Sequence, residues 1–322
     1  MKLKYDPFPF VFTRGDKATK LACLEFFGLG DSPGAQECLL GLIKQQRSDR
    51  AFPSRLDPEN WGMRETVRNA LLLSKAGLPP EGVNVDSAVR FVLGHQRPDG
   101  GWSENRALSI PPERTWLSNE RSITWLTADV AALLRQVGME ERREYRAAVE
   151  WLRRMQNRHG GWPSLAEGTG DQQGGTGDPD ATTQIAFLMG EIYGKDDPAY
   201  LKGRELFERY LDECAQDVER DYRVRLRDGK REDLDVYHLT HLFLSWLLDP
   251  PRRFQSGYDA SDPRVKRMME ALIDIQRDDG GWRPFWTGES SPVYTALALK
   301  VLILSGMLAR EELEANLKAY AV

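Results

Sequence analysis

Apolar and charged residues recur with a helical period along most of the chain. Six segments mix charges with apolar residues at that spacing, as helices half in water do. We predict outer helices over residues 35–46, 85–96, 142–156, 200–216, 264–276 and 310–320. The alternation typical of strands is absent from the sequence, which therefore predicts an all-α protein.

A second set of segments is apolar around most of its circumference, as in LALKVLIL and HLFLSWLL. Such segments are expected to be buried helices. We predict inner helices over residues 17–28, 63–76, 122–137, 181–193, 236–248 and 293–305. Inner and outer helices alternate along the chain, so the pattern predicts six helical hairpins.

One short element repeats at the end of several outer helices. HQRPDGGW, MQNRHGGW and IQRDDGGW end at Trp102, Trp162 and Trp282, and a worn copy, QQRSDRAF, ends at Phe52. A repeat at this period indicates a supersecondary unit that stacks on its neighbours. The glycines end each helix, because glycine adopts the left-handed conformation cheaply. We expect the glutamine and tryptophan to pin one hairpin to the next on the periphery.

The Gln-x-x-x-Gly-Gly-Trp element resembles the repeat of squalene and hopene cyclases and of protein prenyltransferase β subunits, and the resemblance covers most of the chain. It implies an (α/α)6 toroid that forms a single domain over residues 1–322. The candidate site is then the end of the toroid at which the inner helices begin. Long connections enter those helices at residues 103–121, 163–179 and 217–234.

Composition narrows the function classes. The 322 residues carry a net charge of −5, which argues against a nucleic-acid partner. The three cysteines are too scattered for a disulfide framework and suit a reducing compartment. Apolar runs are too short to span a bilayer, and the first residues are not a signal peptide, so we expect a cytoplasmic protein.

A pair of aspartates opens the inner helix after the second well-formed repeat. Asp178-Pro179-Asp180-Ala181-Thr182-Thr183 resembles the Asp-x-Asp-Asp-Thr-Ala motif of class II terpene cyclases. The resemblance implies that Asp180 protonates a double bond or epoxide, with Asp178 as the preceding acid. Ala181 replaces the last aspartate of the motif. The alternative is a structural role, because aspartate in the first turn of a helix caps backbone N–H groups.

The next repeat carries a second Asp-x-Asp, Asp233-Leu234-Asp235, followed by two histidines, His238 and His241. If the hairpins are in register, Asp235 lies at the level of Asp180 on the adjacent inner helix. Cyclases carry a histidine in the following repeat that orients the acid, so we take Asp235 and His238 as catalytic candidates. Asp233 and His241 are candidates for substrate binding.

Aromatic residues near the starts of inner helices are candidates to line a cavity. Their π-faces stabilise carbocations, although ordinary core packing is the alternative for each ring. The predicted substrate-binding rings are Trp125, Tyr237, Trp286 and Tyr294.

Metal and cofactor sites are not expected. Protein prenyltransferases bind zinc through Asp-x-Cys and a later histidine, whereas Asp233-Leu234-Asp235 has Asp in place of Cys. Zinc favours thiolate and imidazole ligands. Mg²⁺ is expected only if the substrate carries a diphosphate, for which Arg64, Arg68, Arg114 and Arg121 are available.

Three functions follow from these features. The first is acid-initiated cyclisation or isomerisation of an isoprenoid or another apolar polyene, in a central cavity and with a partner chain completing the site if one barrel does not suffice. The second is a non-catalytic module that binds a lipid or prenyl group. The third is a prenyltransferase-like subunit. The paired Asp-x-Asp elements favour the first and the loss of the last aspartate favours the second, whereas the absent zinc ligands disfavour the third. Substrate, product and oligomeric state are left open.

Overall fold

A computed structural model describes residues 2–166, 177–228, 234–243 and 252–322 of the chain. These residues group into two compact units. The first unit comprises residues 1–39 and 208–322, and the second comprises residues 40–207. Each unit is built almost entirely from α-helices, in agreement with the predicted class.

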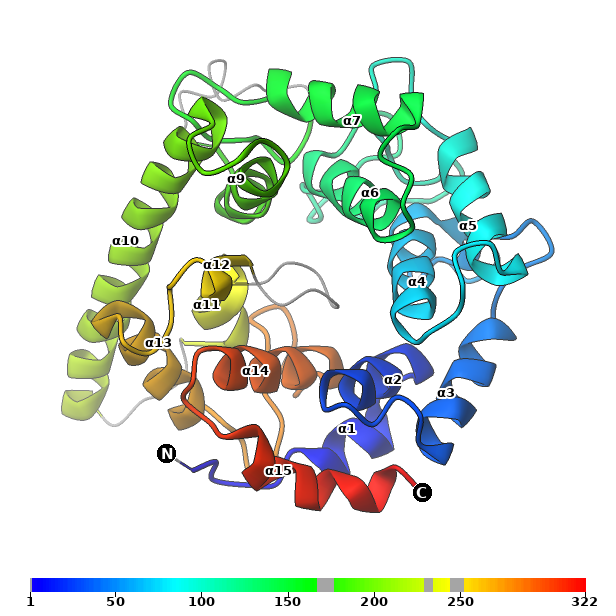
Figure 1. Cartoon of the computed structure of the whole chain (residues 1–322). Helices are drawn as coiled ribbons and strands as arrows, with labels where there is room; N and C mark the ends of the chain where they lie inside the picture. The colour runs from blue at the N-terminus through cyan, green and yellow to red at the C-terminus, as the bar shows by residue number, and fades with distance from the viewer. Residues whose placement is uncertain (1, 167–176, 229–233, 244–251) are drawn as a thin grey trace. The chain divides into compact units, whose positions relative to one another are not determined.

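The second unit contains three apolar helices in a row, α4 (Met63–Lys75), α6 (Thr124–Gln136) and α9 (Pro179–Tyr193). α4 packs on α6, and α6 packs on α9. Helices α5 (Val83–Gly94) and α7 (Arg143–Arg154) form a second layer against this row (Figure 1). The inner and outer helices predicted for this part of the chain therefore exist and alternate.

The first unit has the same alternation. Helix α14 (Pro292–Leu304) contacts α1 (Phe8–Arg14), α2 (Lys17–Phe26) and α11 (Val236–Thr240), and α11 also packs on α13 (Pro263–Asp274). Two further helices contribute residues to both units, α3 (Pro33–Ile43) and α10 (Pro198–Asp228). The first unit also contains η1 (His241–Phe243), α12 (Arg252–Gln255), α15 (Arg310–Leu317) and η2 (Lys318–Tyr320). None of the described helices is both long enough and apolar enough to cross a bilayer.

Each repeat glutamine pins the end of one helix to the start of the next helix in the same layer. The side-chain amide of Gln96 donates to the carbonyl of Gly100 at 2.9 Å and to that of Glu144, the second residue of α7, at 2.8 Å. Gln156 makes the same pair of bonds to Gly160 and Ala199. Gln46 and Gln276 repeat this geometry, so the role predicted for the glutamines is confirmed.

The repeat tryptophans are buried between the two layers. Trp102, Trp162 and Trp282 have no exposed surface. Each indole Nε1–H donates to a backbone carbonyl ten residues earlier, near the end of α5, α7 or α13, at 2.6 to 2.8 Å. The tryptophans therefore contact the outer helices, as predicted. They are fully buried beneath these helices rather than lying on the outer surface.

Four local features differ from the prediction. Helix α10 continues to Asp228, so the start of the predicted connection 217–234 is helical; this stretch has no glycine or proline before Gly229. Helix α1 was not predicted; Pro9 lies in its first turn, where proline is tolerated. Strands β1 (Phe52–Pro53) and β2 (Trp61–Gly62) form a short antiparallel hairpin where no strand was expected. The predicted helix 236–248 is described only to Phe243, as α11 and η1.

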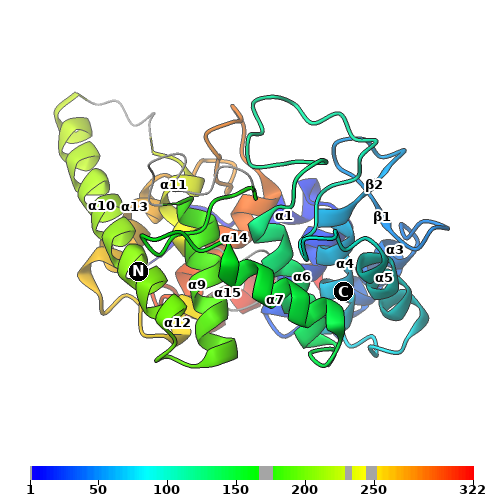
Figure 2. The ribbon, with the colours of Figure 1, turned by 90° about the horizontal axis from the view of Figure 1, so that it is seen from above.

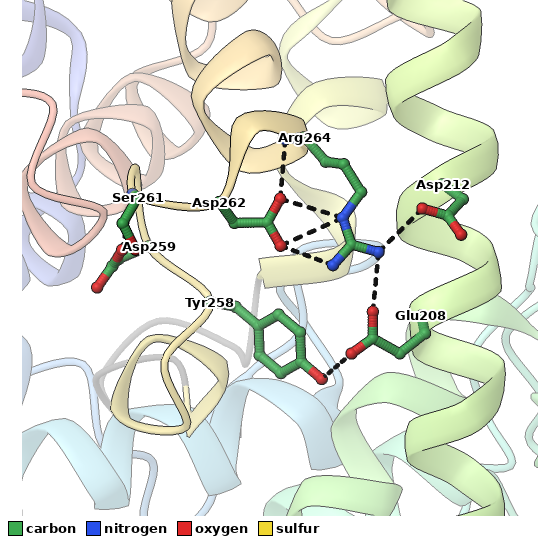
Figure 3. Close-up of polar contacts among 7 residues, drawn as sticks. All are labelled: Glu208, Asp212, Tyr258, Asp259, Ser261, Asp262 and Arg264. Carbon is green, nitrogen blue, oxygen red and sulfur yellow. Dashed lines mark hydrogen bonds and ion pairs between the residues drawn. The ribbon is translucent and has the colours of Figure 1, made fainter.

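A network centred on Arg264 joins α10 to α13 in the first unit (Figure 3). The guanidinium donates to Asp262 at 2.6 Å, to Glu208 at 2.8 Å and to Asp212 at 2.9 Å. Tyr258 donates a short hydrogen bond to Glu208. The hydrogen bond from Arg264 lowers the pKa of Asp262, while partial burial opposes this shift.

This pKa shift makes a prediction about acid stability. A carboxyl whose pKa is depressed by folding stabilises the folded state above its unfolded pKa, and this contribution is lost as the pH falls through the folded value. Asp262→Asn should therefore lower the free energy of unfolding at pH 7 by at most about 1 kcal/mol, because the group is partly solvated. The difference from wild type should be smaller at pH 3 than at pH 7, because the contribution is lost as the pH falls from the unfolded pKa through the depressed folded pKa. Denaturant titrations at both pH values measure it, and a difference that grows on acidification would contradict the assignment.

Candidate functional site

The two aspartates that open α9 have different surroundings. Asp178 is the N-cap of the helix, and its carboxylate accepts the backbone N–H of Ala181 at 2.8 Å. Asp180 lies two residues further on, in the first turn, and has one buried carboxylate oxygen, Oδ1. The capping role considered for this pair thus falls on Asp178.

A buried threonine sets a common register for the three apolar helices of the second unit. The hydroxyls of Thr66, Thr127 and Thr182 accept the backbone N–H of Phe52, Trp102 and Trp162, at 3.0, 3.1 and 2.9 Å. Each of the donating residues, Phe52, Trp102 and Trp162, ends its copy of the repeat. The three threonines therefore occupy equivalent positions on α4, α6 and α9.

This register places three predicted or suspected site residues at one level. Arg64, Trp125 and Asp180 each precede the threonine of their helix by two residues. Trp125 is 6% exposed, and its Nε1–H donates to the carbonyl of Trp116 at 3.2 Å. Trp125 and Asp180 therefore lie at the same helical level on neighbouring helices.

One turn further along, the same helices carry a polar row that the sequence analysis missed as a site. Gln184 donates to Asp129 at 2.6 Å, and the guanidinium carbon of Arg68 lies 6.0 Å from the ring centroid of Trp125. Burial and the charge of Arg64 lower the pKa of Arg68 to about 9, against the opposite effect of Asp129 and Glu65. The guanidinium therefore keeps its charge at pH 7. Asp129 is the only acidic residue of α6 and is buried there, which was the available signal.

Two further acids lie at the start of α4 and were also missed. Glu65 is 7% exposed and Glu104, in the connection after α5, is 2% exposed. Glu104 accepts the backbone N–H of Met63 at 2.9 Å. Figure 2 shows this connection and the β1–β2 hairpin at the same end of the second unit, where Asn105 also donates to the carbonyl of Trp61 at 3.1 Å.

The remaining candidates lie in the first unit. Asp235 is the N-cap of α11 and accepts the backbone N–H of His238 at 3.0 Å. The Nδ1 atom of His241 lies 3.1 Å from the carbonyl of Tyr237 and 3.0 Å from that of His238, so this nitrogen carries the hydrogen. Asp233 lies outside the described residues.

Four predicted substrate-binding residues meet in one aromatic cluster. Tyr237 stacks on His241 at 5.4 Å and meets Trp286 and Tyr294 edge-on at 5.3 and 6.4 Å. Trp286 also contacts Tyr294 at 5.2 Å. Tyr294 is 7% exposed and Trp286 is 47% exposed, so the cluster extends from the core to the surface. The structure thus brings Tyr237, His241, Trp286 and Tyr294 together, a grouping that the sequence did not predict.

Metal ligands do not gather among the residues that the structure describes: no group of three or more His, Cys, Asp or Glu side chains is placed to hold an ion. The catalytic roles assigned to Asp178, Asp180, Asp235 and His238 stay predictions. Asp178 and Asp180 belong to the second unit, and Asp235 and His238 belong to the first.

Comparison with solved structures shows the fold. The chain is similar to the apo structure of type II terpene cyclase MstE from Scytonema, with 14% identity, a TM-score of 0.56, and coverage of 91% of this chain and 89% of that one. A variant of that cyclase in complex with geranylgeranyl dihydroxybenzoate has 15% identity, a TM-score of 0.53 and coverage of 91% and 87%. The ent-copalyl diphosphate synthase from Streptomyces platensis has 17% identity and a TM-score of 0.50, over 90% of this chain and 50% of that one.

These likenesses, together with the helical secondary structure of the described residues, confirm the predicted all-α toroid class. No protein-family model and no curated protein sequence matches the chain.

Proposed function

We propose that this protein catalyses the acid-initiated cyclisation or isomerisation of an isoprenoid or a similar apolar polyene, with Asp180 as the proton donor. The fold supports the reaction class, because similar solved structures are type II terpene cyclases bound to a geranylgeranyl substrate and to a cyclised product, merosterolic acid A. The observation that carries the assignment is that the two aspartates at the start of α9 differ in their hydrogen bonding. Asp178 caps the helix, so Asp180 is not needed as the cap.

The chemistry at Asp180 needs only a protonated carboxyl and an apolar environment. The O–H bond of the acid breaks as a C–H bond forms at one carbon of the double bond, and the other carbon becomes positive. A second double bond of the polyene then closes the ring. Trp125, at the same level on the next helix, offers an indole π-face to the positive charge.

Arg68 favours a substrate with an acidic head group. Its guanidinium keeps its charge beside Trp125 and would repel a carbocation held close to it. A carboxylate, phenolate or diphosphate on the substrate would offset this charge. We expect the proton transfer to require no cofactor, and Mg²⁺ to take part only with a diphosphate substrate.

The aromatic cluster of the first unit is proposed as a contact for apolar prenyl chains. Tyr237, Trp286 and Tyr294 present large apolar rings, and the exposure of Trp286 leaves part of the cluster accessible. Asp235 and His238 lie at the start of the same helix, α11.

Incubation with two isoprenoids tests the proposal. Purified protein is mixed with geranylgeranyl dihydroxybenzoate or with geranylgeranyl diphosphate. The products are separated by liquid chromatography, and their masses are determined by mass spectrometry. Cyclisation and isomerisation are expected to give products of unchanged mass and altered retention. Saturable binding without any new product would instead support the non-catalytic prenyl-binding function.

A further inference from the structure

A buried carboxylate oxygen at the start of α4 lacks a hydrogen-bond partner. Glu65 Oε1 accepts from Arg64 at 2.7 and 3.0 Å, whereas Glu65 Oε2 is buried and has no partner within the described part of the chain. A buried polar atom left unsatisfied destabilises the folded state, because its hydrogen bonds to water are lost without replacement. Gly62 makes room for this oxygen, since a Cβ at that position would lie 2.2 Å from it. The unsatisfied oxygen therefore occupies space that a side chain at position 62 would otherwise fill.

Glu104 supplies a second buried carboxyl at the same place. It comes from the connection after α5, and the backbone N–H groups of Met63 and Arg64 hold it. The charge of Glu65 acts directly on it. Two adjacent buried carboxyls do not both ionise readily, because each charge is desolvated and repels the other. One proton shared between them would remove the repulsion and satisfy Glu65 Oε2.

We propose that Glu65 and Glu104 form a carboxyl dyad that holds one proton and accepts the second proton that ends the cyclisation. The second half of this proposal rests on the proposed function. The dyad binds one proton at rest. In the reaction it removes a second proton from the carbocation formed from the polyene. The base thus lies on a different helix from the acid that starts the reaction.

The register of the helices supports this division of roles. Glu65 is in the first turn of α4 and Asp180 is in the first turn of α9, and α6 packs between these two helices. Trp125 on α6 occupies the level of Asp180. A polyene lying across the three helices would be protonated at α9, would carry its positive charge past Trp125 and would be deprotonated at α4.

The terminating step balances without a co-reactant. A C–H bond next to the cationic carbon breaks, its electron pair becomes the new double bond, and the proton joins the carboxylate of the dyad. The proton lost by Asp180 at the start equals the proton gained here, and exchange with water restores both groups.

The charges around the dyad suit one bound proton. Burial and the negative charge of Glu65 raise the pKa of Glu104. Burial alone would raise the pKa of Glu65 as well, but Arg64 and Arg68 outweigh it and lower that pKa. Arg64 and Arg68 are the cations that act on the dyad. Arg68 is itself affected by the charges of Asp129 and Arg55. The pKa values of the two carboxyls are therefore shifted in opposite directions, and Glu104 is the carboxyl that holds a proton more readily.

Infrared spectroscopy tests the shared proton without any substrate. At pH 7 the wild-type protein should show the C=O stretch of a protonated carboxyl that shifts in D₂O. The band should be absent from Glu104→Gln, which keeps an acceptor for the Met63 N–H, and from Glu65→Gln. It should persist in Glu150→Gln, whose side chain is 73% exposed. Absence of the band from the wild-type protein would overturn the dyad.

Product analysis tests the catalytic role. With a geranylgeranyl substrate, Glu65→Gln should change the ratio of the main olefin to products with a displaced double bond or an added hydroxyl at least about tenfold, because deprotonation loses its base. Substrate consumption should fall less than in Asp180→Asn. An unchanged product ratio would overturn the role. If the wild-type protein consumes no isoprenoid, the proposed function fails and the terminating role with it, whereas the infrared band still decides the shared proton.

Discussion

Asp180→Asn is expected to lower the rate of cyclisation at least about a hundredfold and to leave the free energy of unfolding within about 0.5 kcal/mol of wild type. Asparagine has nearly the shape of aspartate but has no acidic proton to donate. Asp178 provides the cap of α9, so the helix keeps its N-terminal hydrogen bond in the variant. Turnover assays and thermal melts on the same preparation measure both quantities.

Two control variants separate chemistry from helix capping. Asp86→Asn alters an acid in the first turn of α5 that pairs with Arg90 on the helix surface, and it should retain wild-type turnover. Asp178→Ala removes the cap and should cost about 1 kcal/mol of stability. If Asp180→Asn destabilises the protein as Asp178→Ala does and retains turnover, Asp180 is a structural residue and the proposed acid is wrong.

Helix positions could be predicted from the sequence because each helix carries its own information. The apolar period marks the buried face of each helix, and the glycines of the repeat mark the turn that follows an outer helix. Gly100, Gly160 and Gly280 all have positive φ angles, but α5, α7 and α13 end six residues earlier, at Gly94, Arg154 and Asp274, so the prediction that these glycines end the helices is wrong. The glycines instead belong to the turn that follows each helix, where the N–H of Gly100 donates to the carbonyl of Arg97. The length of α10 could not be read in this way, because a charged surface helix lacks a clear apolar period.

The site could be predicted only where a local motif carries it. Asp178 and Asp180 are two residues apart, so their place at the start of α9 follows from the helix itself. Glu65 and Glu104 are 39 positions apart in the sequence, and the side chain of Glu104 reaches α4 from a connection without a regular pattern. The aromatic cluster around Tyr237 likewise joins α11 to Tyr294 on α14 and to Trp286 in the connection before it, through packing that no sequence period encodes.

The sequence contained the equivalence of three threonines, although their spacing conceals it. Thr66, Thr127 and Thr182 follow the ends of their repeats by 14, 25 and 20 residues, so variable connections hide their equivalence. Once the register is known, Glu65 and Ala181 are equivalent positions. The acid absent from the motif on α9 is thus present at the same level on α4, which connects the departure from the terpene cyclase motif to the proposed dyad.

Trp116 is a half-exposed tryptophan and serves as the control for a substitution of the buried repeat tryptophan Trp162. Trp116 lies in the connection between α5 and α6 and is 40% exposed. Its backbone carbonyl, which accepts from Trp125, remains in an alanine variant. Trp116→Ala should therefore change the free energy of unfolding by no more than about 1 kcal/mol. A loss as large as that of a buried tryptophan would show that burial is not the relevant difference.

Trp162→Ala should lower the free energy of unfolding by about 3–5 kcal/mol, as deletion of a large buried side chain does. The indole has no exposed surface, and its Nε1–H donates to the carbonyl of Leu152 near the end of α7. Gly203 on α10 packs directly on the ring, since a Cβ there would lie 3.0 Å from Cζ3 of Trp162. Truncation therefore leaves a cavity where α7 and α10 meet the repeat, and Leu152 loses a hydrogen-bond donor. Trp162→Phe should lose less, because the ring still fills most of the space. Urea titrations of the three variants measure the order, and an alanine variant as stable as wild type would exclude a structural role for the repeat tryptophan.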